Sequence, residues 1–320
     1  NFGTTAGGVK VSLTVDPVGD APTVFFGNKE AEVIATGSTE IKVRTPEAKK
    51  DGPKSVQVVY GDESCILEEG FTYHEDGEGK QGTIGAFFWM LPQGTYWGDD
   101  EAWGEAYFAF VEPTDVSYRD FWGSTMNSCS NDYVPDTNLQ IIDTPLTARL
   151  QNGAAIIDLD FSSEALEYQT MLVDGDFLHQ SSYDLMPNEG QGWPAFDVEH
   201  FIRTPPSIRI VSPDVDGDEM AVVYEDDLTL HWNSAGSGDY VIAQLNLYDY
   251  QGKYVERVRC LLNDDGSHTV YRSIWDHWTD YGYIVLNVGR VRETDAILPT
   301  NGSRSGVVGV SFTAAAVTFE

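Results

Sequence analysis

Basic side chains are scarce in this sequence. Only 19 lysines and arginines stand against 51 aspartates and glutamates, which gives a formal net charge of −32 over 320 residues. A field of that sign repels phosphate backbones and anionic lipid headgroups. The charge therefore argues against a nucleic-acid partner and against binding to an anionic membrane surface.

Long apolar runs and helical periodicity are also lacking. No apolar stretch reaches the roughly 18–20 residues that a helix needs to cross a bilayer, so we expect no membrane-spanning segment. The hydrophobic fraction of 41% and the aromatic fraction of 12% are nevertheless too high for a disordered acidic chain. The acidic side chains therefore decorate folded domains, and such a surface suits a secreted, extracellular protein.

Cysteine is rare, with Cys65, Cys129 and Cys260 far apart in the chain. An odd number leaves at least one of them outside an intramolecular disulfide. Each of the three domains expected below holds one cysteine, so no bond can form within a domain, while a bond between domains or between subunits stays open. For Cys260, in the segment RVRCLL, burial as a small apolar side chain is the favoured interpretation.

The pattern that dominates the sequence is alternation of apolar and polar residues in short runs separated by Gly, Asn, Asp and Pro. This period of two predicts strands. Asn152-Gly153 and Asp265-Gly266 predict tight hairpin turns, and the segment RSIWDHW predicts a short helical turn. We therefore expect an all-β protein built of immunoglobulin-like sandwiches.

Two breaks in the pattern predict three tandem β-sandwich domains, at residues 1–76, 77–204 and 205–320. The first break is the glycine-rich and charged stretch HEDGEGKQG, which reads as a linker. The second is Pro205-Pro206, which bars a helix and forces an extended connection. The last segment has the strand density of an immunoglobulin-like sandwich, and the middle segment is the least regular.

The first segment resembles the IPT/TIG module, an immunoglobulin-like domain. Paired Gly7-Gly8 precede a strand, Gly27 follows an apolar pair, and the runs IKVRTPEAKKDGPKSVQVVY and GFTY follow in the family's order. The glycines allow backbone conformations closed to other residues. Val9 departs from the family's usual threonine. The resemblance covers residues 1–76 and implies the contexts of such modules, which include bacterial surface proteins, polysaccharide-acting enzymes, animal receptors and DNA-contacting factors; the charge argues against the last.

The resemblance also implies a strand that precedes the opening turn, at Asn1-Phe2-Gly3, and the sequence contains no such strand. A sheet without this edge strand exposes unpaired backbone groups that a neighbouring chain could complete. This predicts self-association, with a filament or a surface layer as the assembled form.

One acidic segment is a candidate calcium site. Asp214, Asp216 and Asp218 alternate, and Glu225 follows eleven residues after the first, which is the carboxylate spacing of a calcium loop. The glycine stands at the fourth position of the loop instead of the sixth, and a strand follows, so a helix–loop–helix site is excluded. A solvated acidic turn is the favoured alternative, and calcium is the one candidate cofactor.

A second candidate is a carbohydrate site in the middle segment. Trp97 and Trp103 flank an acidic cluster that includes Asp99 and Asp100. Exposed aromatic faces stack on sugar rings, and carboxylates accept hydrogen bonds from hydroxyls. The favoured alternative is that these large aromatics fill a sandwich core or a domain interface.

Catalytic patterns are missing from the sequence, which has no nucleophile elbow, no zinc-protease helix and no closely spaced histidines. We therefore predict a non-catalytic bacterial cell-surface protein with a structural or adhesive role, whose partners are further copies or other surface proteins. One alternative is a carbohydrate-binding accessory protein, which exposure of Trp97 and Trp103 would favour. The other is a polysaccharide-acting enzyme, which two facing carboxylates in a cleft would favour.

Overall fold

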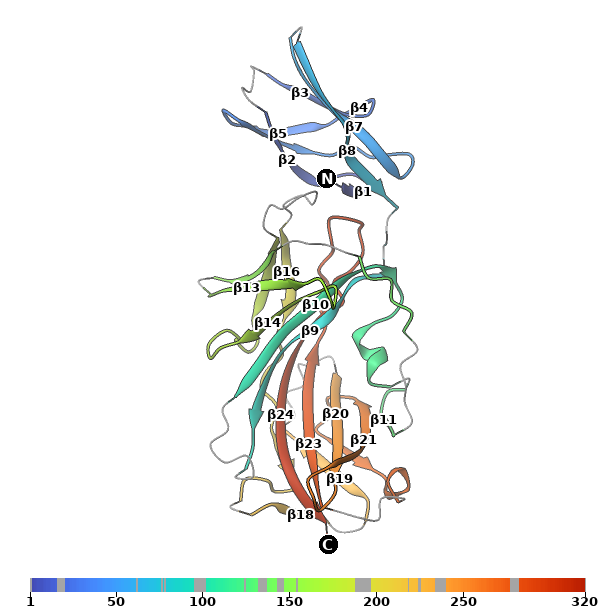
Figure 1. The fold of residues 1–320 in the computed structure, drawn as a ribbon, viewed down its shortest axis with the longest axis vertical. Helices are drawn as coiled ribbons and strands as arrows, with labels where there is room; N and C mark the ends of the chain where they lie inside the picture. Colours follow the sequence, from blue (N-terminus) through green and yellow to red (C-terminus); the bar gives the residue numbers. More distant parts are fainter. Residues whose placement is uncertain are drawn as a thin grey trace.

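The protein is an elongated all-β molecule, with its N-terminal module at one end and the C-terminus at the other (Figure 1). The expected all-β, immunoglobulin-like class is confirmed. No helix among the described residues is both long and apolar enough to cross a membrane. The computed structural model describes residues 2–15, 21–61, 63–75, 77, 79–94, 102–123, 125–131, 137–142, 147–153, 155–187, 197–217, 219–223, 226–233, 240–276 and 282–319.

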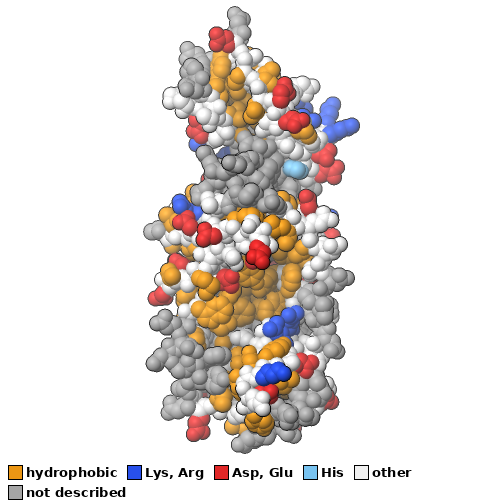
Figure 2. Space-filling view, in the orientation of Figure 1, with side chains coloured by type: hydrophobic (Ala, Val, Ile, Leu, Met, Phe, Trp, Pro, Cys, Tyr) orange, Lys and Arg blue, Asp and Glu red, His pale blue; other side chains and the backbone are white. Residues whose placement is uncertain are grey.

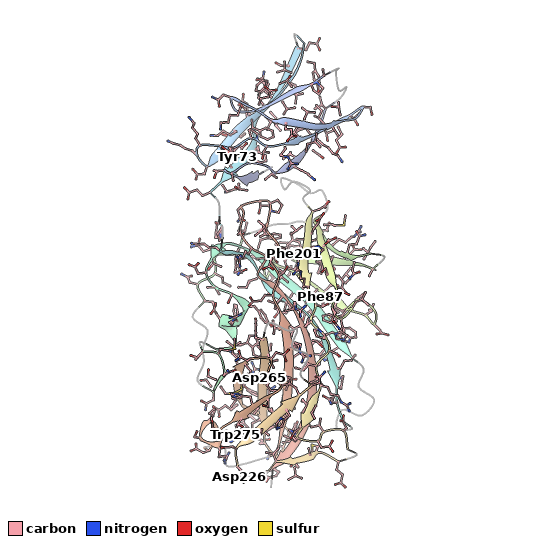
Figure 3. All side chains as sticks on the ribbon, turned by 180° about the vertical axis from the view of Figure 1, so that it is seen from behind. Tyr73, Phe87, Phe201, Asp226, Asp265 and Trp275 are labelled. Carbon is pink, nitrogen blue, oxygen red and sulfur yellow. A yellow bond between two sulfur atoms is a disulfide. The ribbon has the colours of Figure 1, made fainter. Side chains whose placement is uncertain are left out.

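Two sheets form the N-terminal module. The first runs in the order β1 (Phe2–Thr4), β8 (Glu63–His74), β7 (Gly52–Tyr60), β3 (Thr23–Phe26) and β4 (Lys29–Glu30), and the second in the order β2 (Lys10–Thr14), β6 (Glu40–Arg44) and β5 (Glu32–Thr36). Alternating apolar residues place one face of each sheet in a shared core. Val24, Ile41, Phe71 and Tyr73 are almost completely buried there. Figure 3 shows Tyr73 inside this module.

The opening residues form a strand, so the expected turn is wrong for Phe2 and Gly3. The expected empty edge is filled only along the last three residues of β8, and residues 63–71 have β7 as their one strand partner among the described residues. Phe2–Thr4 pairs in parallel with Thr72–His74 at the edge of the first sheet. Gly3 is needed for close packing, because a Cβ there would lie 2.8 Å from Val9 Cγ2. Gly7 and Gly8 have φ values of +73° and +82°, which confirms the conformational freedom expected of this pair.

A single 13-stranded sheet occupies most of the remaining chain. Its strands, in spatial order, are β11 (Ser128–Ser130), β21 (Tyr254–Leu262), β20 (Tyr240–Tyr248), β23 (Tyr283–Arg292), β24 (Val307–Phe319), β9 (Gln81–Pro92), β10 (Trp103–Thr114), β14 (Glu167–Leu172), β13 (Ala155–Ser162), β12 (Ala148–Asn152), β15 (Ser182–Pro187) and β16 (Val198–Arg203), while β18 (Ala221–Val223) pairs with β24. The parallel pairing of β24 with β9 joins strands from both sides of residue 205. One hydrogen-bonded sheet therefore crosses the boundary expected near residue 205. The division into separate domains at 77–204 and 205–320 stays a prediction.

The long sheet encloses two cores. From β9 to β16 it curls around Phe87 and Phe201, and Leu298 from the C-terminal segment completes that core (Figure 3). The other core contains Trp275 and lies between β20–β24 and a small sheet, with the order β17 (Ile210–Ser212), β19 (Leu228–Trp232) and β22 (Ser267–Val270). The 3-10 turn η2 (Arg272–Ile274) lies in the segment predicted to be helical.

A disulfide joins Cys129 in β11 to Cys260 in β21, and the two residues face each other in the antiparallel register. The favoured interpretation, in which Cys260 is buried without a disulfide, is therefore wrong. The disulfide instead links residues of the two domains expected at 77–204 and 205–320. Cys65, in the N-terminal module, is free and exposed.

Candidate functional site

The outer face of the long sheet carries a groove, which we call the outer-face groove. It consists of two adjoining cavities of about 590 and 400 Å³ that share Trp122 and Gln244. Figure 2 shows hydrophobic side chains gathered over this part of the molecule. An extended hydrophobic surface of this kind, with polar groups among the apolar ones, is typical of a ligand site.

Strand alternation places the apolar wall of the groove. Residues with odd numbers on β9 point into the core, so Phe88 and Met90 point outward. Register brings Trp103 of β10 opposite Met90, and Met90 opposite Phe312 of β24. The ring centroids of Phe88 and Trp103 are 5.2 Å apart at 83°, an edge-to-face contact that holds the indole in place. Trp103 is 42% exposed, so it is available to a ligand.

Amide side chains form the opposite wall of the 590 Å³ cavity. Gln244 and Asn246 alternate on β20, and Asn287 of β23 lies opposite Gln244 in the register. Gln244 Nε2 donates to Asn246 Oδ1 over 3.1 Å, and Arg257 Nε donates to the same oxygen over 3.0 Å. These bonds fix the orientation of the Asn246 amide.

The end wall of the groove comes from the segment that connects β10 to β11. The 3-10 turn η1 (Tyr118–Phe121) and Trp122 cover the part of the outer face that contains Ile242 and Val310. The Cys129–Cys260 disulfide anchors this segment to β21, at the edge of the sheet. Burial raises the pKa of the Tyr118 phenol well above its usual value, so its hydroxyl stays protonated at physiological pH.

A single carboxylate lines the described part of the 400 Å³ cavity. Glu167 stands at the start of β14, and burial raises the pKa of its carboxyl, with the negative charge of Glu105 acting in the same direction. Arg257, Arg259 and Gln244 line this cavity from the side of β20 and β21. The cavity therefore has an acidic wall and a basic wall.

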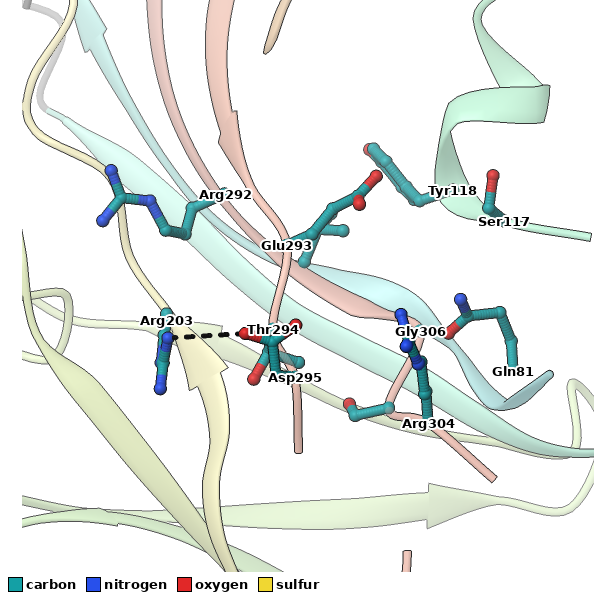
Figure 4. A pocket seen from close by; sticks show the side chains of 12 residues that line it. Gln81, Ser117, Tyr118, Arg203, Arg292, Glu293, Thr294, Asp295, Arg304 and Gly306 are labelled. Atoms are coloured by element: carbon teal, nitrogen blue, oxygen red, sulfur yellow. Dashed lines mark ion pairs between the residues drawn. The ribbon is translucent and has the colours of Figure 1, made fainter. Parts of the chain in front are cut away.

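A third, polar cavity of about 310 Å³ shares Tyr118 with the groove (Figure 4). Three arginines line it together with two carboxylates, namely Arg203, Arg292, Arg304, Glu293 and Asp295. Glu293 Oε1 is 3.1 Å from Arg119 Nη2, and Asp295 Oδ2 is 4.0 Å from Arg203 Nη1. Both carboxylates are thus compensated by guanidinium groups.

The structure places one of the four predicted carbohydrate residues. Trp103 lies in the outer-face groove, half exposed, whereas Trp97, Asp99 and Asp100 lie outside the described residues. The run VIAQLNLY carries a local signal of this wall, because the polar Gln244 and Asn246 lie on one face of an otherwise apolar strand. The residues next to Trp122 in the sequence gave no sign that it lines the groove. The segment that carries Trp122 reaches the sheet only through tertiary contacts.

The predicted calcium residues are only partly described. Asp214 and Asp216 lie in the connection after β17, while Asp218 and Glu225 fall outside the described residues. The Asp216 carboxylate accepts hydrogen bonds from the Arg209 guanidinium and from Gln93 Nε2, the latter over 3.3 Å. Both described oxygens of Asp216 therefore have protein partners, and calcium binding here stays a prediction.

Comparison with known proteins gives one family match. Residues 1–73 match the family model of the IPT/TIG domain. The resemblance of the first segment is thereby confirmed, and we use this name for the N-terminal module. The match covers the IPT/TIG domain alone and not the long sheet that carries the groove. No curated protein matches the chain.

Solved structures that match the chain share little sequence with it. The plexin A4 extracellular region is 10% identical over 83% of this chain and 20% of its own, with a TM-score of 0.26. The chicken CNTN1 FN1–FN3 domains are 8% identical over 97% of this chain and 95% of theirs, with a TM-score of 0.22. The chain thus spans only a fifth of the plexin chain, and with TM-scores below 0.5 these likenesses carry no functional argument.

Proposed function

We propose that this protein is a non-catalytic extracellular protein that binds a glycan chain in the outer-face groove. The observation that carries the proposal is the pairing of the exposed Trp103 ring with the amides of Gln244, Asn246 and Asn287 across one cavity. A sugar ring has apolar faces that stack on aromatic rings and hydroxyl edges that bond to amides. The long open shape suits a chain of several sugars better than a small compact ligand.

Three features support an extracellular, adhesive setting. A disulfide persists in oxidising compartments, and Cys129–Cys260 is placed where it holds a wall of the groove. The acidic surface keeps the protein soluble. The IPT/TIG domain lies at the far end of the elongated molecule, where it can act as a spacer (Figure 1). We extend the proposal to a bacterial cell surface, with glycans of a neighbouring cell or matrix as partners.

Self-assembly through a donated first strand stays a prediction. β1 occupies the edge of β8 only at Thr72–His74, and residues 63–71 pair with β7 alone among the described residues. The groove offers a built site for a ligand, so we propose adhesion through the groove as the main role.

The carboxylates near the groove favour binding over hydrolysis. A retaining glycosidase holds its two carboxyl groups about 5–5.5 Å apart, on either side of the scissile bond. Glu105 pairs in the register with Met171, so its backbone lies four residues, or ~13 Å at the strand rise, along β14 from that of Glu167. Glu105 lines neither cavity, and no described carboxylate faces Glu167 across the 400 Å³ cavity or lines the 590 Å³ cavity.

The proposal predicts that Trp103→Ala weakens glycan binding. Loss of the stacking surface should raise the dissociation constant at least about tenfold, equivalent to ~1.4 kcal/mol. The measurement is a glycan array followed by titration calorimetry on the best ligand. Tyr271→Ala is the matched control, because Tyr271 is 59% exposed and lies outside the lining of the groove. Absence of binding to any glycan, or equal loss in both variants, would contradict the proposal.

A further inference from the structure

Two of the few basic side chains of this acidic protein line the outer-face groove. Arg257 and Arg259 alternate on β21 with the buried Val258 and Cys260, so strand geometry turns both guanidinium groups to the outer face. The chain has only 19 basic residues in all. Two half-buried guanidinium groups in one groove give that part of the groove a positive charge, which suits an anionic group on a ligand.

The contacts of Arg257 leave much of its guanidinium for a ligand. Nε donates to Asn246 Oδ1 over 3.0 Å, and the guanidinium carbon lies 5.8 Å from the centroid of the Tyr254 ring. These contacts fix the plane of the fork without using the Nη donors. No carboxylate among the described residues forms an ion pair with Arg257. The Asn246 amide and the Tyr254 ring are uncharged, so they do not neutralise its positive charge.

The arginines and the aromatic wall lie in the same groove, so one extended ligand can contact both. Arg257 and Arg259 line the 400 Å³ cavity, which shares Trp122 and Gln244 with the cavity that contains Trp103. A chain that stacks on Trp103 and continues past Gln244 therefore reaches the arginines within the same groove. Tyr118 then links the groove to the polar cavity lined by three further arginines.

We propose that the glycan held in the outer-face groove is a uronate-containing chain, and that the Nη groups of Arg257 bind its carboxylate. This inference rests on the proposed glycan-binding function. A guanidinium fork matches a carboxylate in shape and charge, and such bonds are about twice as strong as neutral ones. Glu167 faces the arginines from the opposite wall, where it repels the carboxylate and leaves the arginine side as its single favourable position.

The test uses pairs of ligands that differ only in charge. Tetrasaccharides of galacturonate, glucuronate and mannuronate are each compared with their methyl esters, and neutral chains complete the panel. For the full chain we expect at least one acid to bind about tenfold or more tightly than its ester, as one charge-assisted contact provides. Arg257→Gln should remove this preference and leave ester binding within about twofold. Lys29→Gln in the IPT/TIG domain is the control for net charge.

The outcomes separate this inference from the proposed function. Equal affinity for acid and ester, or binding of neutral chains alone, overturns the uronate assignment and leaves glycan binding intact. Retention of the acid preference in Arg257→Gln overturns the role of Arg257. Absence of binding to every chain overturns the proposed function itself. Unchanged melting of Arg257→Gln confirms that a lost preference reflects the guanidinium and not the fold.

Discussion

Arg290 is the largest charged side chain that the fold buries completely. Its Nε lies 2.8 Å from Asp264 Oδ2 and its Nη2 lies 3.1 Å from Asp264 Oδ1, a bidentate pair. Nη1 donates to Ser207 O over 2.6 Å, and Nη2 donates to Asn233 O. One side chain of β23 therefore fixes the ends of three other segments, including the connection that follows Pro205-Pro206.

We expect Arg290→Met to lower the free energy of unfolding by about 3–5 kcal/mol, because the 5%-exposed Asp264 carboxylate would stay buried without its cation. Urea denaturation followed by tryptophan fluorescence measures this change, since all eight tryptophans lie beyond residue 76. Arg149→Met is the control: its pair with Asp158 is exposed and should contribute at most about 1 kcal/mol. Similar losses in the two variants would contradict the structural role of Arg290.

β11 shows how a three-residue strand can shape a binding site. It pairs with β21 at the edge of the sheet, and its disulfide fastens the preceding segment across the outer face. That segment supplies Trp122, which belongs to both cavities of the groove. A covalent bond is effective here, because so short a strand forms too few hydrogen bonds to stay paired by itself.

Reduction of the disulfide should therefore affect both stability and binding. In a Cys65→Ser background we expect a reducing agent to lower the free energy of unfolding by about 2–4 kcal/mol and to weaken glycan binding as Trp122 loses its anchor. Urea titrations with and without reductant provide the measurement. Cys65→Ser without reductant is the control, and it should behave as the natural sequence does because Cys65 is unpaired and exposed. Unchanged stability on reduction would exclude the anchoring role.

The alternation of apolar and polar residues along each strand could be predicted from the sequence. Which of the outward-facing residues line the groove could not be predicted. The period of two predicted a strand here, and the odd-numbered Val241 and Leu245 of β20 are buried on one of its faces. That the even-numbered Gln244 and Asn246 face a groove depends on which strands lie beside β20. Neighbouring strands are chosen by contacts between residues far apart in the chain, which a local pattern does not encode.

The molecule as a whole consists of the IPT/TIG domain, one long continuous sheet with two cores, and the small sheet β17–β19–β22 that covers one of these cores. The pairing of β24 with β9 extends over eight residue pairs, from Val307↔Gly85 to Ala314↔Pro92. Leu298 and Val307 from the C-terminal segment are part of the core around Phe87. Unfolding either end of this sheet therefore removes contacts from the other.

We expect two thermal transitions in calorimetry, one for the IPT/TIG domain and one for the long sheet with both its cores. Ile41→Ala should lower only the first and Leu286→Ala only the second, each by about 2–5 kcal/mol, since both side chains are fully buried. Tryptophan fluorescence identifies the second transition, because the IPT/TIG domain has no tryptophan. Three transitions, with the core around Phe87 unaffected by Leu286→Ala, would show that residues 77–204 fold separately.

Local sequence patterns were enough to predict the fold class, the N-terminal domain and the surface charge of this protein. Period-two alternation determined the all-β class, paired glycines and their order determined the IPT/TIG domain, and the ratio of acidic to basic residues determined the surface charge. Tertiary structure alone decided the Cys129–Cys260 bond, the β24–β9 junction and the groove. The disulfide joins residues 131 positions apart and the β24–β9 pairing joins residues still farther apart, while the 590 Å³ cavity of the groove gathers residues from five strands and one connecting segment. Their formation depends on the packing energy of the whole sheet rather than on neighbouring residues.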